Sequence, residues 1–176
     1  MSLEWMVGLG GPLIVCDDIA AKNWSGTREG HYELAGSISD YLDIVTVAGN
    51  DYVSLWGDDL SATAIVREQR LFFIARLFYT SGIDIFEEKL LNFVNDYKYI
   101  ESPQRKACFK SNNIYLMDAT NNFRDSEINS FCSLHRVQKG IYEISTHEVD
   151  FDEENRVILH AFMETEYVKE IREQIK

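Results

Sequence analysis

The sequence predicts an α+β fold built on a mainly antiparallel β-sheet. Three observations support this class. Apolar runs rich in β-branched and aromatic residues recur between turn signals, one strongly amphipathic segment interrupts them, and a weaker amphipathic segment ends the chain. With 176 residues, of which 45% are hydrophobic and 12% aromatic, the chain is long enough for one domain with a substantial core.

Ten segments have the composition of β-strands. Two tight turns, at Gly49-Asn50 and at Lys139-Gly140, predict antiparallel hairpins, the second one ahead of the alternating run IYEISTHEV. An acidic run over 150–155 is interpreted as a solvated hairpin tip, because it lacks the glycine and glutamate of a calcium loop. The predicted strands are 13–16, 44–48, 52–56, 62–67, 71–79, 107–110, 114–117, 131–137, 141–149 and 157–164.

Two helices are predicted. The mid-chain helix spans 83–97, where six apolar side chains recur at spacings of three and four and so share one face. A short C-terminal helix over 164–176 repeats the pattern more weakly. We expect a single domain over 1–176. A faint echo between 49–58 and 111–118 leaves open a second organisation, two similar halves (1–80 and 104–164) joined by the helix over 83–97.

The charge of the chain is strongly acidic and uneven. The net charge is -12, and residues 1–66 contain ten acidic and two basic residues. An acidic surface excludes duplex nucleic acid and anionic membranes as direct partners, because phosphate binding needs basic residues. A basic protein partner would instead be attracted to it. The alternative is that these acids only keep the protein in solution.

Signals for catalysis and for cofactors are missing. The stretch WMVGLGGPLIV, residues 5–15, resembles a phosphate loop, but the third glycine of a dinucleotide fingerprint is Leu13, and a strand follows where a helix should. The four histidines are scattered without metal-ligand spacing, and no nucleophile motif is present. We therefore expect no catalytic residues, no metal and no cofactor, and predict that the protein is not an enzyme.

Cysteine usage and the first residues predict the compartment. The three cysteines are Cys16, Cys108 and Cys132, an odd number without paired spacing, which indicates reduced thiols in a cytoplasmic protein. The chain shows no signal peptide and no apolar run of membrane-spanning length.

Short motifs in both halves of the chain, in this order and spacing, form a recognisable pattern: Trp5 to Ile14 (WMVGLGGPLI), Trp24-Ser25-Gly26, Ser39-Asp40-Tyr41, Val53 to Asp58 (VSLWGD), Ala62-Thr63-Ala64, Leu116 to Ala119 (LMDA), Gly140 to Thr146 (GIYEIST) and Leu159-His160. In these motifs the chain resembles the immunity protein 21 family of bacterial polymorphic toxin systems. It departs from the family pattern over 42–45, where a strand follows directly on Asp40-Tyr41.

The resemblance implies a protein made beside a toxin that protects the producing bacterium by binding and blocking that toxin. Many such toxins are nucleases or other nucleic-acid-modifying enzymes with basic clefts, which an acidic surface would fit. The predicted partner-binding residues are five acids and one tyrosine of the acidic half and two tryptophan anchors, for which core packing is the alternative role: Asp40, Tyr41, Asp43, Asp51, Asp58, Asp59, Trp24 and Trp56.

Two other classes stay open at this point. A small-molecule-binding or regulatory α+β domain would have a pocket lined by tryptophan and tyrosine between sheet and helix. A hydrolase would need a cleft that brings a histidine within hydrogen-bond reach of a carboxylate, a serine or a cysteine.

Overall fold

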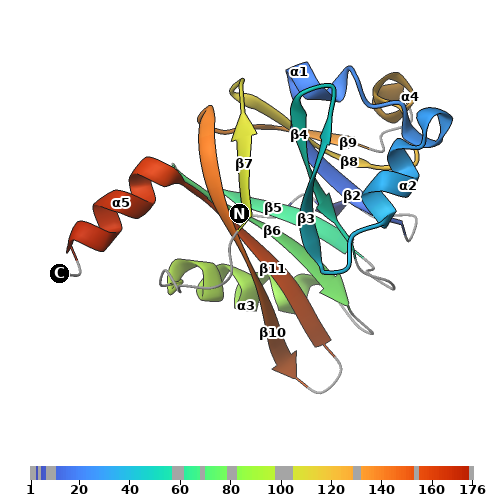
Figure 1. Cartoon of the computed structure of the whole chain (residues 1–176). Coiled ribbons are helices and arrows are strands. Elements are labelled where there is room, and N and C mark those ends of the chain that lie inside the picture. Colours follow the sequence, from blue (N-terminus) through green and yellow to red (C-terminus); the bar gives the residue numbers. More distant parts are fainter. Residues whose placement is uncertain are drawn as a thin grey trace.

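The computed structural model describes residues 3, 5–6, 11–56, 62–67, 70–78, 83–97, 105–128, 132–152 and 155–174. Its strands form two antiparallel sheets, with helices on the outer face of each (Figure 1). The order of the layers is therefore helix, sheet, sheet, helix. The predicted α+β class with mainly antiparallel sheet structure is confirmed.

The first sheet, sheet A, has six strands. In spatial order they are β1 (Trp5–Met6), β5 (Ala62–Arg67), β6 (Leu71–Phe78), β11 (Asn155–Glu164), β10 (Gly140–Asp152) and β7 (Arg105–Phe109). The second sheet, sheet B, has five strands, β3 (Leu42–Val47), β4 (Asn50–Leu55), β2 (Leu13–Asp17), β8 (Asn113–Asp118) and β9 (Cys132–Arg136).

Helices cover the outer faces. The predicted mid-chain helix is α3 (Ile83–Asn95), and the predicted C-terminal helix is α5 (Thr165–Gln174). The other helical elements were not predicted, because segments of four to six residues are too short to show a helical period. They are α1 (Asp18–Ala21), the 3-10 helix η1 (Gly26–Glu29), α2 (His31–Gly36) and α4 (Phe123–Ile128).

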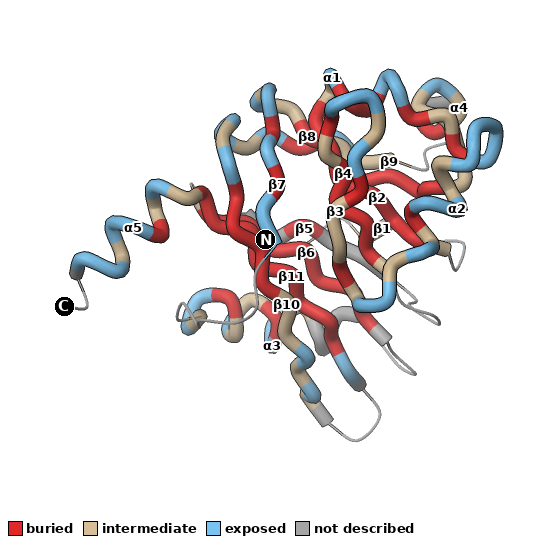
Figure 2. The backbone as a smooth tube through the Cα atoms, in the orientation of Figure 1, coloured by how far each residue is buried: buried red, intermediate tan, exposed pale blue. Residues whose placement is uncertain are grey.

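Three hydrophobic cores hold the four layers together (Figure 2). The central strand β2 shows why its sequence is apolar throughout. Leu13 and Val15 pack between the two sheets, whereas Ile14 and Cys16 pack on the opposite face with residues of α1 and α2. Alternate side chains of a strand point to opposite faces, so a strand covered on both sides loses the polar half of its pattern. The third core joins α3 to the outer face of sheet A through residues such as Leu90 and Val94.

The two halves of the chain share both sheets. In sheet A the order β1-β5-β6 is followed by β11-β10-β7, and β6 pairs with β11 at the centre. In sheet B, β2 pairs with β8 at the centre. The sequence echo compares β4 with β8. The strand that lies beside β8 at the centre of sheet B is β2, and not β4. The similarity of the halves stays a prediction.

One predicted turn is displaced and the other is wrong as a hairpin. Val47 pairs with Asn50, so the loop between β3 and β4 is Ala48-Gly49, with positive φ values of 51° and 74°. Such angles fit the tight turns that join twisted antiparallel strands. At Lys139-Gly140 there is no hairpin, because β9 belongs to sheet B and β10 to sheet A. The acidic run over 150–155 does join paired strands, β10 and β11.

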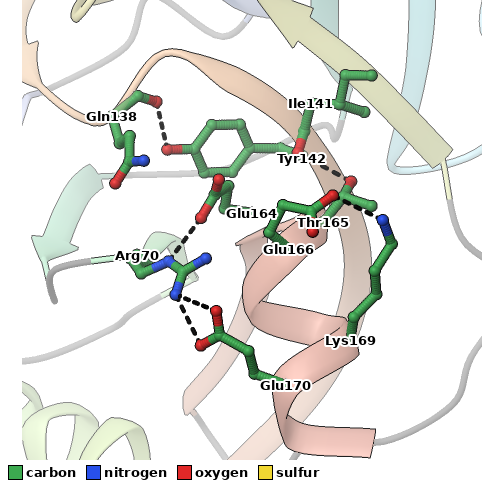
Figure 3. Close-up of polar contacts among 9 residues, drawn as sticks. All are labelled: Arg70, Gln138, Ile141, Tyr142, Glu164, Thr165, Glu166, Lys169 and Glu170. Atoms are coloured by element: carbon green, nitrogen blue, oxygen red, sulfur yellow. Dashed lines mark hydrogen bonds and ion pairs between the residues drawn. The ribbon is translucent and has the colours of Figure 1, made fainter.

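Polar contacts attach α5 to the end of sheet A (Figure 3). Arg70 donates from Nε to Glu164 at 2.6 Å and from Nη1 to both carboxylate oxygens of Glu170 at 2.7 and 2.8 Å. At the helix start the Thr165 hydroxyl donates to the carbonyl of Ile141 at 2.9 Å. Within 165–173, Val168 is the one buried side chain, so the apolar contact of α5 with the sheet is small. The polar contacts add to it.

Candidate binding cleft

A cleft of about 280 Å³ lies between the two sheets, where the start of β3 faces β7 and β10. Exposed charged side chains, Asp40, Arg105 and Glu148, form its rim, and the buried Leu42 and Ile144 form its floor. The described residues that line it are Asp40, Tyr41, Leu42, Arg105, Ile144, Thr146 and Glu148. Two predicted partner-binding residues, Asp40 and Tyr41, therefore lie in one cleft with residues from the second half of the chain.

Asp40 and Tyr41 are held by local contacts. The Asp40 carboxylate accepts a hydrogen bond from the backbone N–H of Tyr41 at 2.8 Å. The Tyr41 phenol faces Glu148 across the cleft. Partial burial raises the pKa of this phenol, and the negative charge of Glu148 raises it further, so the phenol keeps its proton.

Asp43 and Asp51 join the two sheets to each other. Asp43 accepts from the Arg105 guanidinium at 2.9 Å, and Asp51 accepts from the backbone N–H of Cys108 at 3.1 Å. A third acid, Asp17, accepts from the backbone N–H of Lys110. All three donors belong to β7 or to the residue that follows it. These acids bind the backbone and a side chain of an edge strand, so part of the acidic half already has partners within the chain, although the Asp43 side chain is still 41% exposed.

Trp24 is a core residue, so its predicted role as a partner-binding anchor is wrong. Its side chain is 2% exposed, and its indole N–H donates to the carbonyl of Ala119 at 3.0 Å. Its ring packs against those of His31 and Tyr52, with centroids 5.1 and 4.9 Å apart. A buried, hydrogen-bonded indole is stabilised by its own fold and is not available to a partner.

Gly26, in the same motif, has a structural role. Its φ is +64°, and a Cβ there would lie 2.4 Å from the carbonyl oxygen of Thr120. The backbone N–H of Thr27 donates to that oxygen at 3.2 Å. The segment Trp24-Ser25-Gly26 thus attaches the first half of the chain to residues 119–120 of the second.

Trp56 is half-buried beside the cleft residues. Its backbone N–H donates to the carbonyl of Tyr41 at 3.0 Å, and a Cβ added at Gly36 would lie 3.7 Å from its ring. Trp56 thus stays a candidate for partner contact at the edge of α2. Asp58 and Asp59 lie outside the described residues.

The sequence reasoning did not select the residues that close the cleft from the other side, Arg105, Ile144, Thr146 and Glu148. The available signal was the alternation in IYEISTHEV, which puts Ile144, Thr146 and Glu148 on one face of a strand. Nothing in the sequence indicated that this face would lie opposite Asp40 and Tyr41, about 100 residues earlier in the chain.

A serine and a histidine do meet elsewhere. Ser145 Oγ lies 3.0 Å from His147 Nε2, which is also 2.9 Å from the Tyr97 hydroxyl. This contact lies on the opposite face of β10, and Ser145 is 3% exposed, so a substrate has no access to its hydroxyl. Within the described ranges, no three histidine, cysteine or acidic side chains are grouped to hold a metal ion.

Comparisons with known proteins assign the chain to no family. No protein-family model, curated protein or solved structure matches the chain. In the described part of the chain, no helix is both long and apolar enough to cross a membrane.

Proposed function

We propose that the protein is an immunity protein that binds and neutralises a cognate toxin in the bacterium that makes both, with the acidic rim of the cleft as its binding surface. The observation that carries the proposal is the position of Asp40 and Tyr41. Both were selected from the sequence as partner-binding, and both lie on the cleft with the exposed Glu148. The motif resemblance set out above supports the same function.

The acidic surface that supports this function is smaller than the sequence count suggests. Asp43 and Asp51 are committed to contacts with β7, whereas Asp40 is exposed. Leu34 and Glu33 of α2 are also exposed, and Leu34 is 39% exposed. An apolar side chain within an acidic surrounding is a common arrangement for a contact with a basic partner. The net charge of -12 adds long-range attraction, which speeds association.

The first test is rescue on co-expression. The toxin domain encoded beside this gene, most usefully the C-terminal domain of a large secreted protein, should be toxic alone and harmless when this chain is produced with it. If no neighbouring toxin is neutralised, the proposal is wrong.

The second test locates the surface. Asp40→Lys should slow toxin association several-fold at low ionic strength, with a smaller effect as salt rises, because screening weakens steering. Asp96→Lys is the matched control, since it makes the same charge change at an exposed position just after α3, on the outer side of sheet A. Equal association rates for the two variants would contradict binding at the cleft rim.

A second function, small-molecule binding, is favoured by one observation, the cleft itself. Its volume of about 280 Å³ is close to the lower end of ligand pockets, which span roughly 300–1,000 Å³. The cleft lies between two sheets rather than between sheet and helix, and Tyr41 is the aromatic residue among the described residues of its lining. Native mass spectrometry of the purified protein would show a retained ligand as added mass, and the apo mass alone would count against this function.

A further inference from the structure

An arginine side chain is buried beside the cleft, and no described residue serves as its counter-ion. Arg76 of β6 is 2% exposed, and within the described part of the molecule its Nε and Nη1 have no hydrogen-bond partner. His160 of β11 is fully buried, and its Nε2 has no partner either. Ile74 pairs with His160 and Arg76 with Ile158, so Arg76 and His160 are diagonal neighbours on one face of sheet A.

Both groups can donate hydrogen bonds to the same place. Burial lowers the pKa of Arg76 to about 9, so the guanidinium stays charged at neutral pH. Burial, and then the charge of Arg76, lower the pKa of His160 well below its usual value, so its ring is neutral. Thr146 Oγ1 lies 2.9 Å from Nδ1 of His160. When this hydroxyl donates to Nδ1, the proton of the ring is on Nε2, which has no acceptor among the residues that the structure describes.

The acid in the same row of sheet A as Arg76 is already used. Arg76, Ile158 and Glu148 lie in one row across β6, β11 and β10. Ile158 separates the two charged groups, and Glu148 contacts Tyr41 and lies 3.7 Å from the guanidinium of Arg156. A buried guanidinium without a partner is strongly unfavourable, and removal of its charge from water is offset only by an anion or by ordered water.

We propose that an oxyanion, a carboxylate or phosphate group, binds on this face of sheet A and accepts hydrogen bonds from Arg76 and His160. Either anion can accept a charge-assisted hydrogen bond from Nε–H or from Nη1–H of the guanidinium and compensates its charge. Thr146 lines the cleft and also contacts His160, so the ligand enters from the cleft side. The observations that support this site do not rest on toxin binding at the rim.

The test follows the Arg76 Nε–H resonance by NMR in the full chain, with sodium acetate and sodium phosphate as probes and sodium chloride at equal ionic strength as reference. We expect a saturable shift of this resonance with one or both probes and none with chloride. A response to acetate alone identifies a carboxylate site, and a response to phosphate alone a phosphate site. The same probes should raise the melting temperature of the wild-type protein.

Two variants separate the site from general salt effects. Arg76→Gln should abolish the anion-dependent rise in melting temperature, whereas Arg28→Gln, which removes an exposed arginine of η1 away from the cleft lining, should keep it. No saturable shift with either probe would overturn the proposal, because ordered water would then satisfy Arg76. A change of the Arg76 resonance in the Asp58→Asn, Asp59→Asn double variant without added anion would also overturn it, by assigning the counter-ion to the chain itself.

Discussion

The pH dependence of stability should be governed in part by His160. The folded protein holds this ring neutral, because burial and then the positive charge of Arg76 lower its pKa well below the ordinary value. In the unfolded chain the ring takes up a proton with a pKa of about 6.5. Below that pH the unfolded state therefore binds more protons than the folded state, and the free energy of unfolding falls as pH falls.

The magnitude follows from the linkage relation. Each pH unit below the unfolded pKa costs about 1.4 kcal/mol as long as the folded ring stays neutral. Between neutral pH and pH 5 the loss attributable to His160 is thus about 2 kcal/mol, a large part of the net stability of an ordinary domain. Burial also lowers the pKa of His147, so this half-buried ring adds a loss of the same sign.

Urea unfolding at several pH values between 7.5 and 5 measures this effect. The quantity compared is the difference in free energy of unfolding between the wild-type protein and His160→Asn, whose side-chain amide can still bond the Thr146 hydroxyl. Contributions from carboxylates cancel in this difference. We expect the advantage of the wild-type protein to shrink by about 2 kcal/mol between pH 7.5 and 5. Parallel curves for the two proteins would refute the reasoning, because His160 would then gain its proton equally in both states.

Two further predictions concern the segment that joins the halves of the chain. Gly26→Ala should lower the free energy of unfolding by about 2–4 kcal/mol, because a Cβ there adds both left-handed backbone strain and overpacking against Thr120. Gly49→Ala is the control and should cost only about 1 kcal/mol, because Gly49 has a φ of +74° but nothing within 4 Å of an added Cβ. Equal urea midpoints for the two variants would contradict the contact with Thr120. Trp24→Phe should lower the free energy of unfolding by about 1–3 kcal/mol, because the Ala119 carbonyl loses its hydrogen-bond donor. The folded variant should bind toxin as the wild-type protein does. Weakened binding would show that Trp24 is an anchor for the partner.

Long periodic elements were predictable from the sequence. The strand over 62–67 has the predicted bounds, and the helix predicted over 83–97 ends at Asn95. Each pattern persists over enough residues to report which face is buried. The short helices α1, α2 and α4 lacked such a signal. Their positions depend on contacts made after folding, such as the packing of Ala20 and Ala35 around Trp24.

The candidate site was only half predictable. Asp40 and Tyr41 were selected because acidic and aromatic residues suit a basic partner, but the same reasoning selected Asp43 and Asp51, which contact β7. Local sequence does not distinguish an acid that faces solvent from one that faces an edge strand more than 50 residues later. The buried charge of Arg76 was equally invisible, because its strand resembles any other apolar run.

The sequence by itself determined the class of fold, its long strands and helices, and the acidic charge that any partner meets. These properties depend on composition and on the spacing of neighbouring residues, which act before the chain is folded. Only the tertiary structure decided how the two halves share both sheets and which acids bind residues of the other half. It also decided that Asp40 and Tyr41 lie opposite Glu148. Such outcomes depend on pairing between distant segments, where backbone hydrogen bonds and side-chain volume must be satisfied together.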